Sequence, residues 1–218
     1  MNLKCNFLIR LGNLYSQQQR FREAEERLKE ALSLEPPDRN TKANILITLA
    51  NVYSQQQHFK EAEEKLKEAI SQEPPDRNTK ANILITLANV HSQQQRFKEA
   101  EEKLKEALSL EPPDKNIMIS IHYASGSLYE RKGDSERAKE KFEEIVKFAG
   151  EIPSFANKNK FLGGTYFHLG CIYQKMGEKG EAKHHFRESL KFIPGHRKAR
   201  ESLEKLSKSQ RNTGGDCI

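Results

Sequence analysis

The sequence repeats itself at a fixed interval of 38 residues. The stretch from Leu49 to Ile83 appears once upstream, from Leu11, and again in shortened form from Leu87. Periods of roughly 20–50 residues are typical of solenoids, in which each unit buries its apolar face against its neighbours. The repeat therefore predicts a stack of similar units instead of a domain built around one central core.

Each repeat has the pattern of two helices joined by a short turn. In the second repeat, apolar residues recur at helical spacing from Ile45 to Tyr53, and the polar run Ser54–His58 follows as the turn. The next helix, from Phe59 to Ile70, has one apolar face and one face of Glu and Lys. A Pro-Pro pair ends it, because proline cannot continue a helix, and Asp76 or Asn78 is placed to cap the next one.

A small residue recurs at one place in the second helix of all five units. These residues are Ala24, Ala62, Ala100, Ala138 and Ala182. Four positions later each unit has a large apolar residue, namely Leu28, Leu66, Leu104, Phe142 and Phe186. Helices whose axes approach to about 8–10 Å need a small side chain at the closest point, so the alanines predict tight packing between helices.

These residues resemble the motif of the tetratricopeptide repeat. The first unit supplies Gly12, Tyr15, Ala24 and Pro36, the third has His91 in place of the tyrosine, and the fourth lacks the closing proline. The fifth unit matches best, with Tyr166, Leu169, Gly170, Tyr173, Gly177, Ala182, Phe186 and Pro194. The units are about four residues longer than is usual in this family, and in this they resemble the kinesin light chain and related scaffold proteins.

The resemblance implies an all-α fold, a right-handed superhelical solenoid of five helix-turn-helix units plus a C-terminal capping helix. We expect a single solenoid over residues 1–209, followed by a disordered tail at 210–218. Its expected parts are units at about 5–38, 43–76, 81–114, 119–150 and 163–196, and a capping helix at about 196–209. Ten extra residues between the fourth and fifth units predict a longer linker or an extended helix there.

The positive charge is concentrated at one end of the sequence. From Ala156 onward the sequence contains thirteen Lys and Arg and six Asp and Glu, a net charge of +7, whereas the whole chain carries +6. This asymmetry keeps open a nucleic-acid-associated helical repeat as an alternative. Few aromatic residues lie among these basic residues and no base-reading pattern is present, so a solvated basic surface is the favoured interpretation.

The sequence contains no motif typical of an active site. G-x-S-x-G, Walker-type, H-E-x-x-H and C-x-x-C patterns are absent, so we expect no enzyme activity and no cofactor. Adjacent His184 and His185 would point about 100° apart on a helix, which favours surface histidines over a metal site.

Nothing in the sequence predicts export or membrane insertion. The chain has three cysteines with no metal or redox spacing, no apolar run of about 18 residues and no recognisable signal peptide. These features predict a cytoplasmic protein with reduced thiols and without membrane insertion.

The resemblance also implies a concave groove that is lined by the first helix of each unit and binds a peptide. The residues expected there are Asn13, Asn44, Thr48, Asn51, Asn82, Thr86, Asn89, Tyr123, Arg131, Phe167, His168 and Lys175. Asn13, Asn51 and Asn89 form a ladder, and an amide both donates and accepts hydrogen bonds, so the ladder can hold a peptide backbone. The alternative is that these asparagines bond to neighbouring helices or are copies left by duplication.

The groove changes character toward the C-terminal end, where aromatic and basic residues replace the amides. We expect an aromatic or acidic segment of the ligand at that end. The carboxylate clamp of chaperone-binding family members requires Lys and Arg on consecutive first helices. Ile9, Thr48, Asn82 and Thr86 stand in those places, so this sequence lacks the clamp.

The predicted function is a non-enzymatic protein-protein interaction scaffold that binds an extended peptide or a partner helix in its concave groove. Two alternatives remain at this point. One is a scaffold that self-assembles by end-to-end stacking of its similar units. The other is the nucleic-acid-associated repeat that would use the basic C-terminal end.

Overall fold

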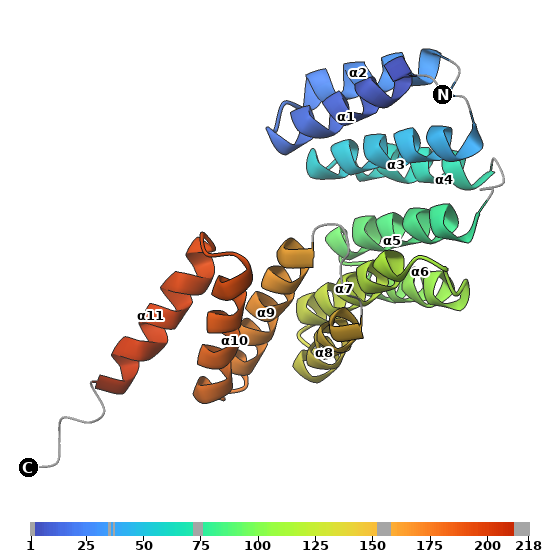
Figure 1. Ribbon diagram of the computed structural model, residues 1–218. Coiled ribbons are helices and arrows are strands. Elements are labelled where there is room, and N and C mark those ends of the chain that lie inside the picture. Colours follow the sequence, from blue (N-terminus) through green and yellow to red (C-terminus); the bar gives the residue numbers. More distant parts are fainter. Residues whose placement is uncertain (1–2, 35, 37, 72–75, 152–157, 212–218) are drawn as a thin grey trace, which may run out of the picture. The chain divides into compact units, whose positions relative to one another are not determined.

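The computed structural model describes residues 3–34, 36, 38–71, 76–151 and 158–211, which form eleven helices and no strand (Figure 1). The predicted all-α class, with paired helices followed by a C-terminal helix, is confirmed. In chain order the helices are α1 (Leu3–Gln17), α2 (Phe21–Ser33), α3 (Arg39–Gln55), α4 (Phe59–Ser71), α5 (Arg77–Gln93), α6 (Phe97–Ser109), α7 (Lys115–Lys132), α8 (Ser135–Glu151), α9 (Lys158–Lys175), α10 (Lys179–Phe192) and α11 (Arg197–Arg211).

The chain divides into two compact units, residues 1–121 and residues 122–218, and the boundary falls within α7. The expected single solenoid over residues 1–209 stays a prediction. Helix α11 runs to Arg211, slightly beyond the expected end of the capping helix. The remainder of the expected disordered tail, and residues 152–157 of the expected linker, lie outside the described residues.

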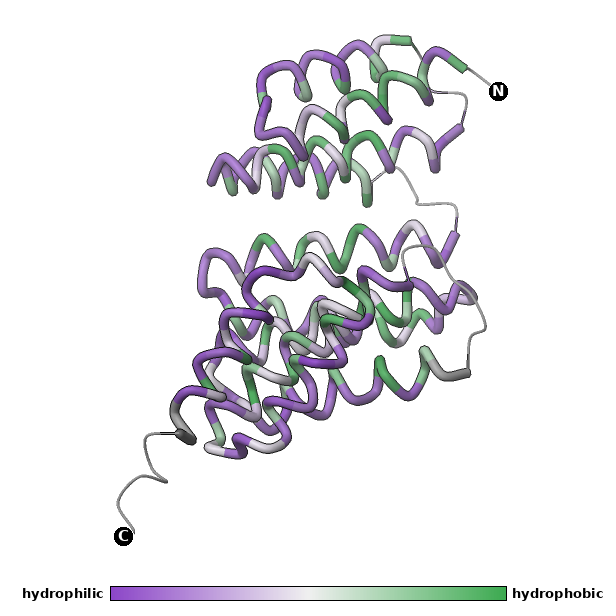
Figure 2. Tube along the Cα trace, turned by 60° about the vertical axis from the view of Figure 1, so that its left-hand side comes forward, coloured by the Kyte–Doolittle hydropathy of each residue, from purple (hydrophilic) through white to green (hydrophobic). Residues whose placement is uncertain are grey.

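Unit 1 consists of three helical hairpins, α1–α2, α3–α4 and α5–α6, followed by the start of α7. Successive hairpins contact each other through α2 with α3 and α4 with α5. Figure 2 shows hydrophobic and hydrophilic residues alternating in short runs along each helix, as expected when every helix buries one face. The small and large residues expected at helix contacts, such as Ala62 and Leu66, are fully buried.

Aspartate side chains cap the N-termini of α3 and α5, each the first helix of its hairpin. The carboxylate of Asp38 accepts a hydrogen bond from the backbone N–H of Thr41 at 2.8 Å, and Asp76 accepts one from Thr79 at 2.7 Å. Each bond satisfies one of the N–H groups that have no partner within the helix. Of the two candidate caps in the second repeat, Asp76 therefore has this role.

The turn inside each hairpin needs one residue in the left-handed region. Gln19, Gln57 and Gln95 have φ values of 61°, 64° and 62°, and Gly133 and Gly177 have 80° and 83° at the corresponding turns. A left-handed residue reverses the chain directly after a helix. Glycine adopts this conformation without strain, whereas a glutamine is destabilised there because of its Cβ atom.

In unit 2, α9 contacts both α8 and α10, and α11 packs against α10. Ala199 and Leu206 of α11 are buried in one cluster with Ala182 and Phe186 of α10. The C-terminal helix thus covers an apolar face of the last hairpin, as the spacing of its apolar residues predicts. Among the described helices, none is both long enough and apolar enough to cross a membrane.

Candidate functional site

A groove of about 490 Å³ runs across the first helices of unit 1. It is lined by Ile9, Asn13, Asn44, Ile47, Thr48, Asn51, Asn82, Ile85, Thr86 and Ser120, which come from α1, α3, α5 and the start of α7. Six of the seven residues predicted for this part of the chain are therefore brought together. The seventh, Asn89, is exposed on α5 one turn after Ile85 and does not line the groove.

The amide groups of the groove are available to a ligand. Within the described residues, the side chains of Asn13, Asn51 and Asn89 make no hydrogen bond to another protein group, and all three are exposed. The Asn44 and Asn82 side chains also make no hydrogen bond within the described residues. The alternative that the ladder asparagines bond to neighbouring helices thus has no support among these contacts.

Unlike the asparagine amides, the threonine hydroxyl groups of the groove already make hydrogen bonds within the protein. The Thr48 hydroxyl donates to the backbone oxygen of Asn44, and the Thr86 hydroxyl donates to that of Asn82, both at 2.8 Å. Ser120 bonds to the Asn116 backbone oxygen in the same way, at 2.9 Å. Each hydroxyl proton is therefore used within its own helix, so these residues can offer a ligand only an oxygen lone pair and, for threonine, a methyl group.

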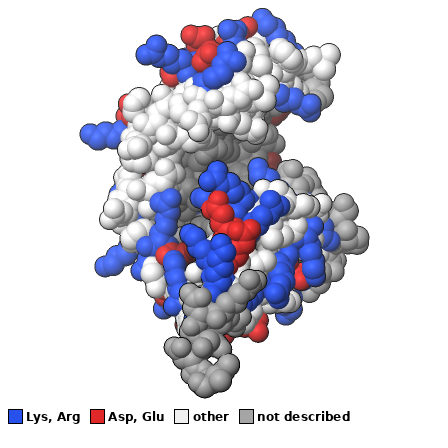
Figure 3. Space-filling model, turned by 90° about the vertical axis from the view of Figure 1, so that its left-hand side faces the viewer, with Lys and Arg blue, Asp and Glu red and all other residues white. Residues whose placement is uncertain are grey.

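The lining of the groove contains no charged side chain among the described residues. Ile9 and Ile47 are half-buried and Ile85 is buried, and these three isoleucines stand at equivalent places in successive 38-residue repeats. Figure 3 shows a broad area below the charged top of the molecule that is largely free of Lys, Arg, Asp and Glu atoms. A row of isoleucines beside a row of free amides can hold an extended polypeptide, the amides taking its backbone and the isoleucines its apolar side chains.

In unit 2, several of the predicted ligand-binding residues bond to one another. The Tyr123 hydroxyl lies 3.1 Å from Nε2 of His168, and Nδ1 of His168 lies 2.7 Å from Oε2 of Glu130. The other carboxylate oxygen of Glu130 lies 3.9 Å from the Lys175 ammonium. The His168 ring also stacks on Phe142 at 4.9 Å between centroids, so Tyr123 and His168 help to join α9 to α7 and α8.

The charges of this network shift two pKa values. Burial alone would raise the pKa of Glu130, but its hydrogen bond with His168 and the charges of His168 and Lys175 outweigh burial and lower that pKa. Burial, and then the Glu130 charge, raise the pKa of Tyr123. At neutral pH Glu130 is therefore an anion and Tyr123 a neutral phenol, the states that the chain of hydrogen bonds requires.

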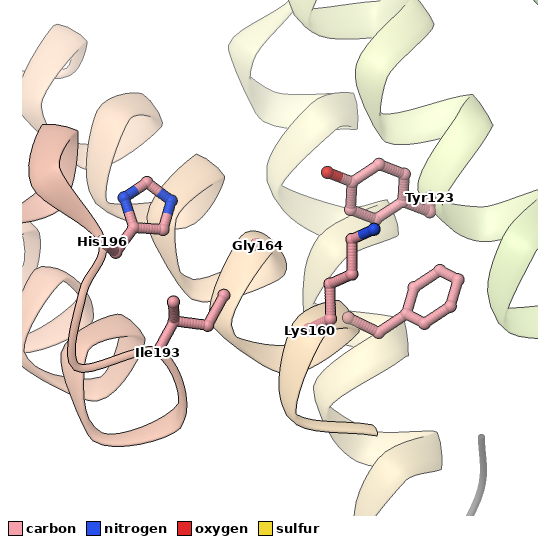
Figure 4. Close-up of a pocket in the computed structure, with 6 residues that line it drawn as sticks. Tyr123, Lys160, Gly164, Ile193 and His196 are labelled. Carbon is pink, nitrogen blue, oxygen red and sulfur yellow. The ribbon is translucent and has the colours of Figure 1, made fainter. Parts of the chain in front are cut away.

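A second pocket, of about 520 Å³, lies next to this network in unit 2. Its lining residues are Tyr123, Lys160, Phe161, Gly164, Ile193 and His196. Figure 4 shows His196 and Ile193 on one side of the space and Tyr123 and Lys160 on the other, with Gly164 between them.

Tyr123 is the one predicted residue that lines this pocket. The Phe167 ring stacks on that of His196, at 4.6 Å between ring centroids, but Phe167, Arg131 and Lys175 are not among the residues that line the pocket. The Gly163-Gly164 pair, which is unfavourable inside a helix, was the sequence signal that could have indicated this pocket.

His185, Cys5 and Cys171 have structural surroundings. Within the described residues, no three His, Cys, Asp or Glu side chains gather in a way that could hold a metal ion. His185 is stacked between Tyr173 and Tyr166, at 5.0 and 5.9 Å between centroids. Burial raises the pKa of the Cys5 thiol, and it raises the pKa of Cys171 to about 11, so both are protonated at neutral pH.

Comparison with known proteins agrees with the repeat pattern. Three family models, each described as a tetratricopeptide repeat, match residues 5–72, residues 81–114, and residues 119–151 with 164–196. Together these matches cover well over half of the chain. No curated protein sequence gives a significant match.

Solved structures show the same fold at low sequence identity. TTC0263, a thermophilic tetratricopeptide repeat protein of Thermus thermophilus, aligns at 18% identity over 93% of this chain and 98% of its own, with a TM-score of 0.71. PilF of Pseudomonas aeruginosa aligns at 18% identity over 98% and 93% of the two chains, with a TM-score of 0.65. YrrB, described as a tetratricopeptide repeat protein with an unusual peptide-binding site, aligns at 17% identity over 90% of each chain, with a TM-score of 0.53. At such identities the likeness concerns the fold alone, and with the family models and the repeats of the sequence it leads to one conclusion: the chain belongs to the tetratricopeptide repeat family.

Proposed function

We propose that this protein is a non-enzymatic scaffold that binds an extended segment of a partner protein in the groove of unit 1. The observation that carries the proposal is the set of asparagine amides with no hydrogen bond to the described residues, arranged beside a row of isoleucines. YrrB, which has the same fold, is described as having a peptide-binding site.

The lining of the groove indicates which segment it would bind. Because no charged residue is among the described residues that line it, a run of charged ligand residues would lose hydration without gaining an ion pair. The isoleucines favour a segment with small or medium apolar side chains, and the amides favour an extended backbone whose own N–H and C=O groups are free. An extended, uncharged segment fits these features better than a partner helix, whose backbone groups are already bonded.

Other parts of the predicted function remain proposals. Preference for an aromatic or acidic ligand segment in unit 2 would depend on residues such as Phe167 and Lys175, and the exposed Lys175 is compatible with it. End-to-end self-assembly and nucleic-acid binding have no specific contact among the described residues to favour them. The likeness of the 38-residue units to kinesin-light-chain-type scaffolds and the cytoplasmic location also remain predictions from the sequence.

The test begins with a selection of peptides from a random library, with the whole chain as bait. Each selected peptide is then titrated against the double variant Asn13→Ala/Asn51→Ala, which removes two amides that line the groove. Two lost hydrogen bonds at about 1 kcal/mol each correspond to an affinity loss of at least about tenfold. The unfolding temperature should stay nearly unchanged, because both side chains are exposed and unbonded within the described residues.

Gln18→Ala is the matched control, since it removes an exposed amide from the turn after α1 and should change neither property. Unaltered peptide binding by the double variant would refute the amide ladder as the binding element. Unfolding of the double variant would show instead that the asparagines are structural.

A further inference from the structure

The second pocket, in unit 2, lies where the residues of the repeat change from amides to other groups. Gly164 occupies the place that Asn44 and Asn82 have in the groove of unit 1. Tyr123 occupies the place of Ile85. None of the described residues that line the second pocket has an amide side chain, so it lacks the groups that would hold an extended backbone in the groove.

The two adjacent glycines of α9 differ in what surrounds them. A Cβ atom at Gly163 would lie 2.5 Å from Cγ1 of Ile193, so the segment after α10 can pack against α9 only because this residue is a glycine. Among the described residues, a Cβ atom at Gly164 would meet Tyr123 alone, at an acceptable 3.4 Å from its hydroxyl oxygen. Glycine inside a helix is destabilising relative to alanine, and packing does not require it at Gly164. The open space beside Gly164 is therefore what needs an explanation, and a ligand supplies one.

His196 presents an N–H group to this space. Its Nδ1 accepts a hydrogen bond from the backbone N–H of Ala199 at 3.3 Å, and its ring stacks on Phe167. Because Nδ1 accepts, the proton of the neutral ring is on Nε2. Nε2 has no partner among the described residues, and the ring stands at the edge of the pocket in Figure 4. The protein thus fixes the direction of a hydrogen-bond donor that it does not itself use.

A cation and apolar groups complete the lining. The Lys160 ammonium makes no ion pair or hydrogen bond with the described residues, and no acidic side chain is among the described residues that line the pocket. Lys160 lies across the space from His196 (Figure 4). Phe161, whose ring is edge-on to that of Tyr123 at 6.0 Å between centroids, and Ile193 supply apolar surface. Few polar groups converging on an apolar space are typical of a small-molecule site.

We propose that the second pocket binds a small aromatic monocarboxylate that carries a further hydrogen-bond acceptor. The carboxylate would pair with Lys160, and the acceptor at the other end would take the N–H of His196. The aromatic ring would contact Phe161 and Ile193. A volume of about 520 Å³ suits a small organic ligand. This site is separate from the groove of unit 1, so it stands whether or not the groove binds a peptide.

The probe is 4-acetylbenzoate, which has a carboxylate and a ketone oxygen at opposite ends of one ring. It is titrated against the whole chain at constant ionic strength and followed by nitrogen-proton NMR. We expect saturable shifts of the backbone signals of Gly164 and Ile193, with a dissociation constant of about 2 mM or below, the affinity expected for a ligand of this size. The side-chain signals of Asn13 and Asn51, in the groove of unit 1, should not move.

Lys160→Gln should weaken the binding of 4-acetylbenzoate about threefold to fivefold, because an ion pair in contact with solvent contributes only modestly. The uncharged methyl ester of the probe should bind equally to this variant and to the unchanged protein. Lys179→Gln, which removes another exposed lysine of unit 2, is the matched control and should leave binding unchanged. Gly164→Leu should abolish saturable binding by filling the space, and circular dichroism checks that this variant is folded.

Two results would overturn the proposal. One is the absence of saturable shifts at about 10 mM 4-acetylbenzoate. Shifts of the same signals by a peptide selected on this chain would then assign the pocket to polypeptide binding. The other is equal affinity of Lys160→Gln and the unchanged protein for the carboxylate, which would show that Lys160 does not recognise the anion.

Discussion

Replacing Gly170 by alanine should destabilise unit 2, although alanine is the better helix former. A Cβ atom at Gly170 of α9 would lie 2.6 Å from both Cδ1 and Cε1 of the Phe186 ring on α10. No real contact is so short, and Phe186 is fully buried, so the ring or the helices must move. Gly126 faces Phe142 in the same way, with the nearest ring atom at 2.8 Å.

The repeats supply the rule behind this prediction. At the position of Gly170 the second and third 38-residue repeats have Ala50 and Ala88, and in both repeats the opposing residue is a leucine. Four of the five repeats thus combine glycine with phenylalanine or alanine with leucine, whereas the first combines Gly12 with Leu28. Overpacking by one methyl group costs about 1–3 kcal/mol, and the helix propensity of alanine offsets about 1 kcal/mol of that. The net loss expected for Gly170→Ala is therefore up to about 2 kcal/mol.

The assay is urea unfolding followed by circular dichroism on Gly170→Ala, Phe186→Leu and the double variant. The double variant should be more stable than the sum of the single effects implies, by about 1 kcal/mol or more, because the smaller leucine accommodates the added methyl group. Gly164→Ala on the same helix is the matched control, since its nearest neighbour atom, the Tyr123 hydroxyl oxygen, lies at an acceptable 3.4 Å. Additive effects, or equal stability of Gly170→Ala and Gly164→Ala, would refute the argument from close approach.

Three further predictions concern unit 1 and use the same unfolding assay. Burial, and then the Arg96 charge, lower the pKa of His91, so the protein should lose stability as the pH falls below about 6.5, where the unfolded chain takes up the proton more readily. His91→Tyr, which introduces the residue found at Tyr53, should reduce this loss, and an unchanged pH profile would contradict the role of His91. Gln57→Gly should stabilise the fold by about 1 kcal/mol, because Gln57 adopts a φ of 64°, and a loss of stability would show that its side chain matters more than its backbone. Leu66→Ala should cost about 2–5 kcal/mol, because Leu66 is fully buried, and a loss below about 1 kcal/mol would place it outside the core.

The sequence predicted most of the fold because the information is local and repeated. Helix pairs, their caps and their buried alanines all follow from patterns within 38 residues, and every copy of the pattern supports the others. The groove of unit 1 was predictable for the same reason, since its lining residues stand at equivalent places in successive 38-residue repeats. The in-helix bonds of Thr48 and Thr86 were missed, although threonine inside a helix commonly bonds the carbonyl four residues before it.

Unit 2 was harder to predict because its side chains depend on contacts between distant segments. Tyr123 and His168 bond to each other across 45 positions, and neither residue indicates this by its spacing. The second pocket combines Tyr123 of α7 with Lys160 of α9 and with His196, which precedes α11. Such a combination can be recognised only when the helices have been packed, because no repeat of the sequence contains it.

The most direct test of the central claim is a nitrogen-proton NMR spectrum of the asparagine side-chain amides, recorded with and without a peptide selected on this chain. If the groove of unit 1 binds an extended polypeptide, the signals of Asn13 and Asn51 should exchange rapidly with water in the free protein. On addition of the peptide they should shift and exchange more slowly. Protection of these amides before any peptide is added, or unchanged signals while the peptide is bound, would contradict the claim.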